Sequence, residues 1–147
     1  MKVSVQEAPF DFAAEMAAFG VGRADVGAVV SFIGVVRDDT GRMRALELEH
    51  YPGMTERAVT KITEEAIARW NLVDALVIHR HGRLGIGEQI MMVATAARHR
   101  GDAFAAAEFL MDYLKSRAPF WKKEHGLGGE TDWVAAKDSD EDALKRW

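Results

Sequence analysis

The residues best suited to chemistry lie around Pro119, where four cations flank the proline and an aromatic pair: Lys115, Arg117, Lys122 and Lys123. Pro119 has no amide hydrogen and disfavours helical geometry at Ala118, so the backbone is predicted to turn between the two pairs of cations. Like charges lower the pKa of a partly buried lysine, which makes its amine available as a base or nucleophile. The segment therefore predicts an anion-binding corner with lysine chemistry. In an alternative interpretation, the cations only interact with the negative end of the preceding helix, while Phe120 and Trp121 close the core.

Three other cationic side chains are predicted at the ends of elements. Arg37 follows a strand expected over 27–36, at the start of the turn-forming run 38–41. His99 and Arg100 lie between a strand and a helix for which Asp102 is the predicted N-cap. An arginine can hold a phosphate through two parallel hydrogen bonds, and the free amides of a helix start add to anion binding. These positions therefore predict further contacts to an anionic ligand.

The composition excludes several functional classes. At 147 residues, of which 48% are hydrophobic, the chain is predicted to form one domain over 1–147 with a proper core. The net charge of -4 disfavours a nucleic-acid-binding module, and a flat titration with oligonucleotides at low salt would dismiss that alternative. The absence of cysteine excludes disulfides, thiolate metal sites and a persulfide carried on this chain.

Metal binding and membrane association are also disfavoured. His79 and His81 would share one face of a strand, but no carboxylate accompanies them at a recognisable ligand spacing, so we predict partly buried, hydrogen-bonded histidines and no metal site. No apolar run approaches the roughly 20 residues that span a bilayer, and the N-terminus does not resemble a signal peptide. A cytoplasmic protein without a membrane segment or a cofactor is the expectation.

The hydrophobic pattern predicts an alternation of strands and helices. Val3 and Val5 alternate as in a strand, and Asp11 is placed to cap a first helix. A second helix, with Val59, Ile62, Ala66 and Trp70 at helical spacing, is expected to end at Asn71. Further strands are predicted over 27–36, 45–51, 75–80, 88–97 and 132–136, and a third helix from Asp102 to Lys115.

The arrangement of these elements follows from their patterns. The β-branched run 27–36 is predicted to be a buried strand, hairpin-paired with the half-exposed strand 45–51. The glycine-bearing segment 82–87 is predicted to be a hairpin turn, and the segment after 136 a charged tail. The buried stripe of the third helix is predicted to be Ala103, Phe104, Ala107, Leu110, Met111 and Leu114. The order of elements indicates an α+β protein with a mixed or largely antiparallel sheet.

Several separated motifs together identify a resemblance to a known family. These are the run 48–55 (LEHYPGMT), the run 78–80 (IHR), His99-Arg100, and the runs 113–115 (YLK) and 120–122 (FWK). In this order they resemble the large, catalytic subunit of molybdopterin synthase, and the likeness extends from about Gly27 to Trp147. The resemblance therefore covers most of the chain.

The resemblance implies an α/β hammerhead-type fold and a homodimer. It further implies a heterotetramer in which each large subunit binds a small, ubiquitin-like sulfur-carrier subunit. The carrier's C-terminal Gly-Gly thiocarboxylate would enter the active site. The implied reaction is the transfer of two sulfurs onto cyclic pyranopterin monophosphate, which forms the dithiolene of molybdopterin for molybdenum cofactor biosynthesis. A chain without cysteine must obtain its sulfur from such a partner.

The resemblance also implies a set of site residues. Lys115 and Lys122 match the catalytic lysines, and Lys137 lies where a basic residue would reach the neighbouring subunit's pocket. Val35 stands where relatives often have a polar or basic residue, which departs from the family pattern. The implied substrate-binding residues are Val35, Val36, Arg37, His99, Arg100, Lys115, Lys122, Lys123 and Glu124.

A mechanistic hypothesis assigns Lys115 to the carrier's C-terminal carbonyl, with a covalent adduct as one form of that contact, and Lys122 to proton transfer or charge stabilisation. The opposite division of roles is equally compatible with the sequence. The alternative function is a non-catalytic protein of the same fold that binds the carrier. Retention of both Lys115 and Lys122 disfavours that alternative.

Overall fold

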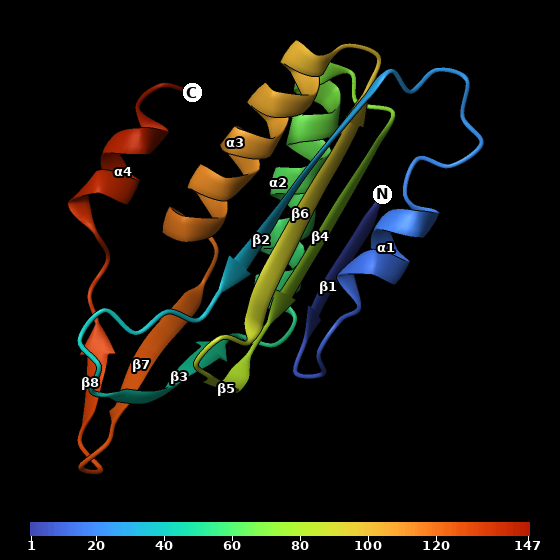
Figure 1. Cartoon of the computed structure of the whole chain (residues 1–147). Coiled ribbons are helices and arrows are strands. Elements are labelled where there is room, and N and C mark those ends of the chain that lie inside the picture. The colour runs from blue at the N-terminus through green and yellow to red at the C-terminus, as the bar shows by residue number, and fades with distance from the viewer.

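Two four-stranded sheets and four helices make up the structure, a computed structural model that describes residues 1–147 (Figure 1). The first sheet contains, in spatial order, β1 (Lys2–Gln6), β4 (Asp74–Arg80), β6 (Gln89–Ala97) and β2 (Ala28–Val35). The second contains β5 (Gly82–Gly85), β3 (Met43–His50), β7 (Phe120–Gly126) and β8 (Thr131–Val134). The helices are α1 (Phe12–Ala18), α2 (Met54–Trp70), α3 (Arg100–Ser116) and α4 (Asp138–Leu144).

The strand directions confirm the predicted α+β class. β1 runs parallel to β4, whereas every other neighbouring pair is antiparallel. The first sheet is therefore mixed and the second is antiparallel. None of the helices is long and apolar enough to cross a membrane.

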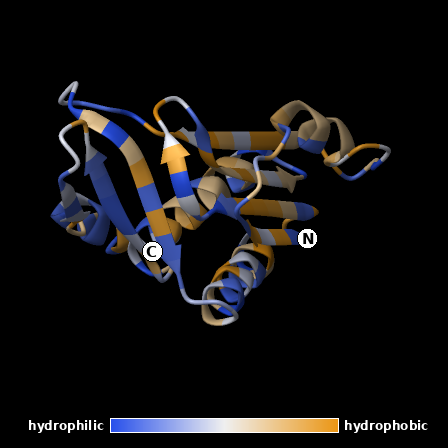
Figure 2. Cartoon of the chain, turned by 90° about the horizontal axis from the view of Figure 1, so that it is seen from below, coloured by the Kyte–Doolittle hydropathy of each residue, from blue (hydrophilic) through white to orange (hydrophobic).

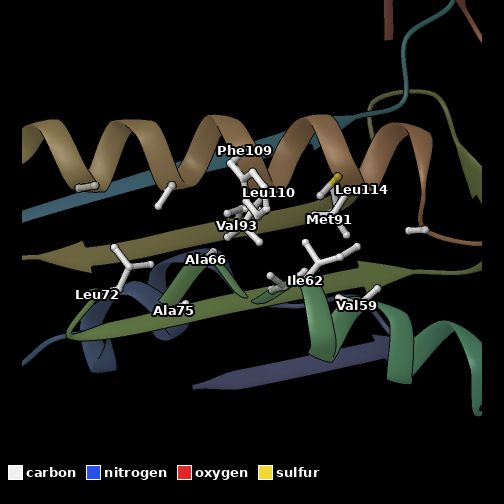
Figure 3. Packing of buried hydrophobic residues seen from close by; sticks show 14 of the residues in the cluster. Val59, Ile62, Ala66, Leu72, Ala75, Met91, Val93, Phe109, Leu110 and Leu114 are labelled. Atoms are coloured by element: carbon white, nitrogen blue, oxygen red, sulfur yellow. The ribbon is translucent and has the colours of Figure 1, made fainter. Parts of the chain in front are cut away.

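The main core lies between the first sheet and the helices α2 and α3. Figure 3 shows Phe109, Leu110 and Leu114 of α3 pointing toward Met91 and Val93 of β6. All five side chains are buried, and burying a residue of this size stabilises the fold by roughly 1.5–3 kcal/mol. The apolar stripe predicted for α2 lines the same core with Val59, Ile62 and Ala66, which confirms the helical spacing.

Both faces of the strands β4 and β6 are covered, which explains their continuous apolar runs. Leu76, Ile78 and Met92 lie on the face opposite the main core, where side chains of α1 and its flanking loops pack on them. Figure 2 shows hydrophobic residues concentrated in the central strands, whereas hydrophilic residues dominate the leftmost strand. A strand that is buried on both faces has no need for polar alternation.

The prediction of a buried strand over 27–36 is wrong for β2, in which no residue is buried. Val29, Phe32 and Val35 are 42%, 39% and 49% exposed. β2 is an edge strand that pairs only with β6, with Phe32 opposite Val93. A β-branched run indicates a strand, but it does not say whether a second strand covers its other edge.

The predicted hairpin between 27–36 and 45–51 is also wrong. β3 pairs with β5 on one side and with β7 on the other. The segment 82–87 was predicted to be only a hairpin turn, but it contains the short strand β5. The two strands that it joins, β4 and β6, pair antiparallel as a hairpin requires. Alternating hydrophobicity determines which face of β3 is buried, but not which strands lie beside it.

The C-terminal third of the chain holds two elements that the sequence patterns missed. The cationic segment after Pro119 continues as β7, and the predicted charged tail contains α4. The start of α3 was misplaced as well, because the N-cap is His99 and Asp102 lies inside the first turn. Phe104, predicted to be buried, is 62% exposed, and Phe109 occupies the core in its place.

Candidate active site

The corner at Pro119 joins the C-terminal end of α3 to the first residue of β7. The amides of Arg117 and Ala118 both donate to the Tyr113 carbonyl, at 2.7 and 3.1 Å, which tightens the last turn of the helix. The chain then reverses, and the Phe120 amide donates to the Ala118 carbonyl at 2.8 Å. Lys115 on the final helical turn and Lys122 on the strand therefore lie on the two arms of one corner. The predicted turn between the cations is confirmed.

Lys122 has the most perturbed environment among the lysines of this corner. It lies in the middle of the second sheet, opposite Leu48 of β3 and Val134 of β8. Part of its side chain is exposed, but surrounding atoms desolvate the ammonium and this lowers its pKa. Repulsion from Lys115 is the second cause, and Lys137 adds a weaker repulsion, whereas Asp140 acts in the opposite direction. Lys122 therefore releases its proton more readily than a free lysine.

Lys137 reaches this cluster from a different part of the chain. It is the N-cap residue of α4, which packs beside the end of α3. The Ser116 hydroxyl donates to the Asp140 carbonyl at 2.9 Å, and Arg117 pairs with Glu141 at 2.8 Å. Within a single chain, then, Lys137 is a neighbour of Lys122. Asp140 was missed because its segment was interpreted as a tail, although acidic residues clustered at 138–142 are typical of a helix start.

The next two residues of β7 project to alternate sides of the strand. Lys123 faces Glu49, with 3.7 Å between Nζ and a carboxylate oxygen, and its ammonium lies 4.4 Å from the centre of the Trp133 ring. Glu124 lines a polar hollow with Arg42, Glu130 and other residues near the tip of the β7–β8 hairpin. Alternation puts Glu124, but not Lys123, on the same side of β7 as Lys122.

Arg37 lies just beyond the end of β2, where the sequence predicts it. Its side chain is 74% exposed, and its guanidinium pairs with Asp39 at 2.7 Å. Val35 is also exposed, but Val36 is buried in a small core with Leu48 and Leu84. The amide and carbonyl of Val36 both form backbone hydrogen bonds, at 2.9 and 2.8 Å, so this residue has no free polar group for a ligand. The burial and backbone hydrogen bonds of Val36 fix the end of β2 next to Arg37.

His99 and Arg100 lie at the opposite end of α3 from Lys115. The helix has 17 residues, which corresponds to a length of about 25 Å at 1.5 Å per residue. Figure 1 shows the C-terminal end of α3 near the arrowhead of β2, and its first turn at the far end of the first sheet. One chain therefore brings Lys115 and Lys122 together with Lys137, but it does not bring His99 and Arg100 to them.

The histidines are part of the structure around the same corner. His79 is 6% exposed, its Nδ1 lies 2.8 Å from the Arg80 carbonyl, and its ring stacks on Phe120. His50 and His81 stack on each other with their ring centres 4.0 Å apart. The predicted hydrogen bond is confirmed for His79, which is more deeply buried than the partial burial expected. No group of three or more histidine and carboxylate side chains is arranged to hold a metal ion.

Comparison with known proteins identifies the family. A family model described as "MoaE protein" matches residues 5–117, which is most of the chain. The chain belongs to the MoaE family. The match includes Lys115 and ends before Lys122, but similarity to individual MoaE proteins extends over the rest of the chain.

Among curated MoaE relatives, the molybdopterin synthase catalytic subunit of Cereibacter sphaeroides is 67% identical over 147 residues and covers all of both chains. A solved structure of the molybdopterin biosynthesis MoaE protein from Burkholderia ambifaria has a TM-score of 0.84 at 51% identity, over 99% of this chain and 97% of that one. The crystal structure of molybdopterin synthase from Staphylococcus aureus has a TM-score of 0.81 at 30% identity, covering 90% and 96%. Sequence similarity and similarity of fold therefore both support membership of the MoaE family.

Proposed function

We propose that this MoaE-family chain is the catalytic subunit of a molybdopterin synthase. Its reaction is the transfer of two sulfurs to cyclic pyranopterin monophosphate, which forms the dithiolene of molybdopterin. The observation that carries the proposal is the pair Lys115 and Lys122 on the two arms of the Pro119 corner, one of them with a lowered pKa. A lysine that gives up its proton readily beside a second, cationic lysine suits both proton transfer and the binding of negative charge.

The sulfur comes from a partner, because the chain contains no cysteine to carry it. The partner is a small, ubiquitin-like carrier whose C-terminal Gly-Gly ends in a thiocarboxylate. In each transfer the thiocarboxylate sulfur bonds to a carbon of the pterin side chain as the carbon–oxygen bond at that carbon breaks. Sulfur thus replaces oxygen, and the oxygen leaves as water or stays on the phosphate. The bond between that sulfur and the carrier's carbonyl carbon then breaks as water adds, and the carrier leaves as a carboxylate. Two carrier molecules supply the two sulfurs of one dithiolene.

The two lysines have different roles in this proposal. Lys115, at the negative end of the α3 dipole, contacts the carrier's terminal carbonyl, and once its proton has passed to Lys122 its amine can add to that carbonyl carbon to form a covalent adduct. Lys122 donates and accepts the protons that accompany the breaking of the carbon–sulfur bond, since its lowered pKa suits proton exchange. Lys123 and Glu124 follow Lys122 on β7 and belong to the same substrate-binding segment, with Glu124 on the side of Lys122 and Lys123 on the other side of the strand.

The anionic pterin phosphate is held by residues of two chains. Arg37 lies at the same end of the first sheet as Lys115, whereas His99 and Arg100 lie about 25 Å away at the start of α3. A second copy docked in the opposite direction would bring its own His99 and Arg100 to the lysines. Two copies of this chain form the homodimer, and one carrier bound to each copy completes the heterotetramer. We place the assembly in the cytoplasm. Lys137 adds a positive charge to the site of its own chain or to that of the neighbouring subunit.

The first experiment measures dithiolene formation from cyclic pyranopterin monophosphate with a thiocarboxylated carrier. The native chain should form product, and Lys115→Ala should lower the rate at least ~100-fold without loss of carrier binding. Lys61→Ala, which removes an exposed lysine on α2, is the matched control and should keep the native rate. A native chain that binds the carrier but makes no product would instead be a non-catalytic carrier-binding protein.

A mixing experiment tests whether two chains share a site. Lys115→Ala and Arg100→Ala should each be inactive alone, but a mixed dimer combines the intact Lys115 of one chain with the intact Arg100 of the other. Random re-pairing makes half of the dimers mixed, with one intact site each, so about a quarter of the native activity should return. If co-refolded variants stay as inactive as each variant alone, both residues belong to the same chain's site.

A further inference from the structure

Two buried side chains from distant parts of the sequence hold the Pro119 corner. One is Thr55 in the first turn of α2, and the other is His79 near the end of β4. Thr55 is fully buried and His79 is 6% exposed. Thr55 contacts Pro119 and His79 contacts Phe120, where the helix carrying Lys115 leads into the strand carrying Lys122.

Thr55 holds the corner through its hydroxyl. The hydroxyl donates to the Pro119 carbonyl at 3.2 Å and accepts a hydrogen bond from the Tyr51 amide at 2.9 Å. Pro119 has no amide hydrogen, so its carbonyl is the only backbone polar group by which the proline can be held. The bond therefore connects the start of α2 to the centre of the corner, 64 residues along the chain.

His79 holds the other side of the corner through its ring. The imidazole stacks on the Phe120 ring, with ring centres 3.8 Å apart and an angle of 18° between the planes. Its Nδ1 is placed to donate to the Arg80 carbonyl at 2.8 Å, which fixes the orientation of the ring. Phe120 and Lys122 are two residues apart on β7 and project to the same side, so the stack orients the side of the strand that presents Lys122.

We propose that Thr55 and His79 are positioning residues that set the separation and direction of Lys115 and Lys122. This inference rests on the roles proposed above for the two lysines. The corner contains few bonds of its own, because the proline contributes no donor and the helix ends at Ser116. A displacement of about 1 Å between catalytic groups can lower a rate about 100-fold, so the two contacts have a direct effect on turnover.

Thr55→Val tests the hydroxyl, and the chain offers a matched control. Thr63 is also fully buried on α2, and its hydroxyl donates to the Val59 carbonyl of the same helix at 2.8 Å, without contact to the corner. At a temperature where all variants are folded, Thr55→Val should lower kcat about 10- to 100-fold with KM for the pterin unchanged. Thr55→Ser, which keeps the hydroxyl, should recover kcat to within about threefold, and Thr63→Val should retain the native kcat.

A second readout does not depend on turnover. Nuclear magnetic resonance titration of the Lys122 side chain should show a higher pKa in Thr55→Val, since a loosened corner hydrates the ammonium and moves it away from Lys115. The Thr63→Val titration should match the native chain. Identical Lys122 titrations and equal kcat in the two valine variants would overturn the inference. If the native chain makes no product, the proposed function fails, while the titration still tests the positioning role.

His79 provides an independent variant in case Thr55→Val does not fold. His79→Phe keeps an aromatic ring against Phe120, whereas His79→Ala removes the stack. The phenylalanine variant should retain at least ten times the kcat of the alanine variant and a Lys122 titration closer to native. Equal kcat and equal titrations in the two variants would show that the stack does not position Lys122.

Discussion

Lys122 differs from an ordinary surface lysine because charged groups of two helices act on its ammonium. Lys115 on α3 and Lys137 at the start of α4 repel its charge, Asp140 attracts it, and the surrounding atoms remove part of its hydration. The lowered pKa is the net result, with desolvation as its largest cause. The sequence places Lys115 and Lys122 seven residues apart, and the family resemblance assigns Lys137 to a neighbouring subunit's pocket. Neither indicates that Asp140 acts on Lys122.

Replacing either of the two α4 residues should move the pKa of Lys122 in a predictable direction. Lys137→Gln removes a positive neighbour and should raise the pKa, whereas Asp140→Asn removes a negative neighbour and should lower it further. Nuclear magnetic resonance titration of Lys122 in both variants measures the shifts. Lys61→Gln on α2 is the control and should leave the titration unchanged. Shifts of the same sign in both α4 variants would contradict this account.

At the scale of elements, α4 is a short helix that depends on its contacts. A helix of seven residues is marginal by itself, so its position follows from what holds it at each end. Near its start it is bonded to the end of α3, and beyond its end the Trp147 indole donates to Asp112 at 2.7 Å. The Trp147 ring also packs edge-on against Trp70 and Phe109, which joins the chain terminus to α2 and α3.

Trp147→Ala should therefore loosen α4 and destabilise the whole chain. Loss of this packing and of the indole hydrogen bond should lower the free energy of unfolding by about 2–4 kcal/mol, measured in urea. Amide hydrogen exchange across α4 should become faster as well. Trp133→Ala, at a 56% exposed tryptophan of β8, is the control and should cost less than about 1 kcal/mol. Equal losses in the two variants would show that Trp147 has no anchoring role.

At the scale of the whole molecule, His79 makes stability depend on pH. Burial is the main cause that lowers its pKa from 6.5 to about 4, and the charge of Lys122 contributes. Between these values the unfolded chain binds a proton that the folded chain does not, so folding stability is lost as the pH falls. Burial also lowers the pKa of His81, with repulsion from His50 as a second cause, so it acts in the same direction.

The expected loss from His79 is about 3 kcal/mol between pH 6.5 and pH 4, since each pKa unit corresponds to 1.36 kcal/mol. Urea unfolding at a series of pH values measures it. His79→Phe should flatten the curve over this range, while the smaller slope from His81 remains. A native chain as stable at pH 4 as at pH 7 would contradict the buried, neutral state of His79.

Local sequence patterns were sufficient to predict most elements. The helical spacing of Val59, Ile62 and Ala66 predicts α2, and the left-handed backbone of Asn71 ends it as expected. The apolar runs of β4 and β6 predict two strands that pair with each other. These features depend on residues within a few positions of one another, so the sequence alone determines them. The proline corner belongs to the same class, because the missing amide of Pro119 acts locally.

Only the tertiary structure decided which distant residues meet. β3 pairs with β7 across 70 or more residues, and this pairing puts Lys122 in the middle of a sheet. The length of α3 separates Arg100 from Lys115, although the sequence assigns both to one anionic ligand. Thr55 and His79 reach Pro119 and Phe120 from α2 and β4, and no spacing indicates that contact. Strand pairing and side-chain packing depend on the whole chain closing around its core, whereas helical and strand periodicity depends on neighbours in the sequence.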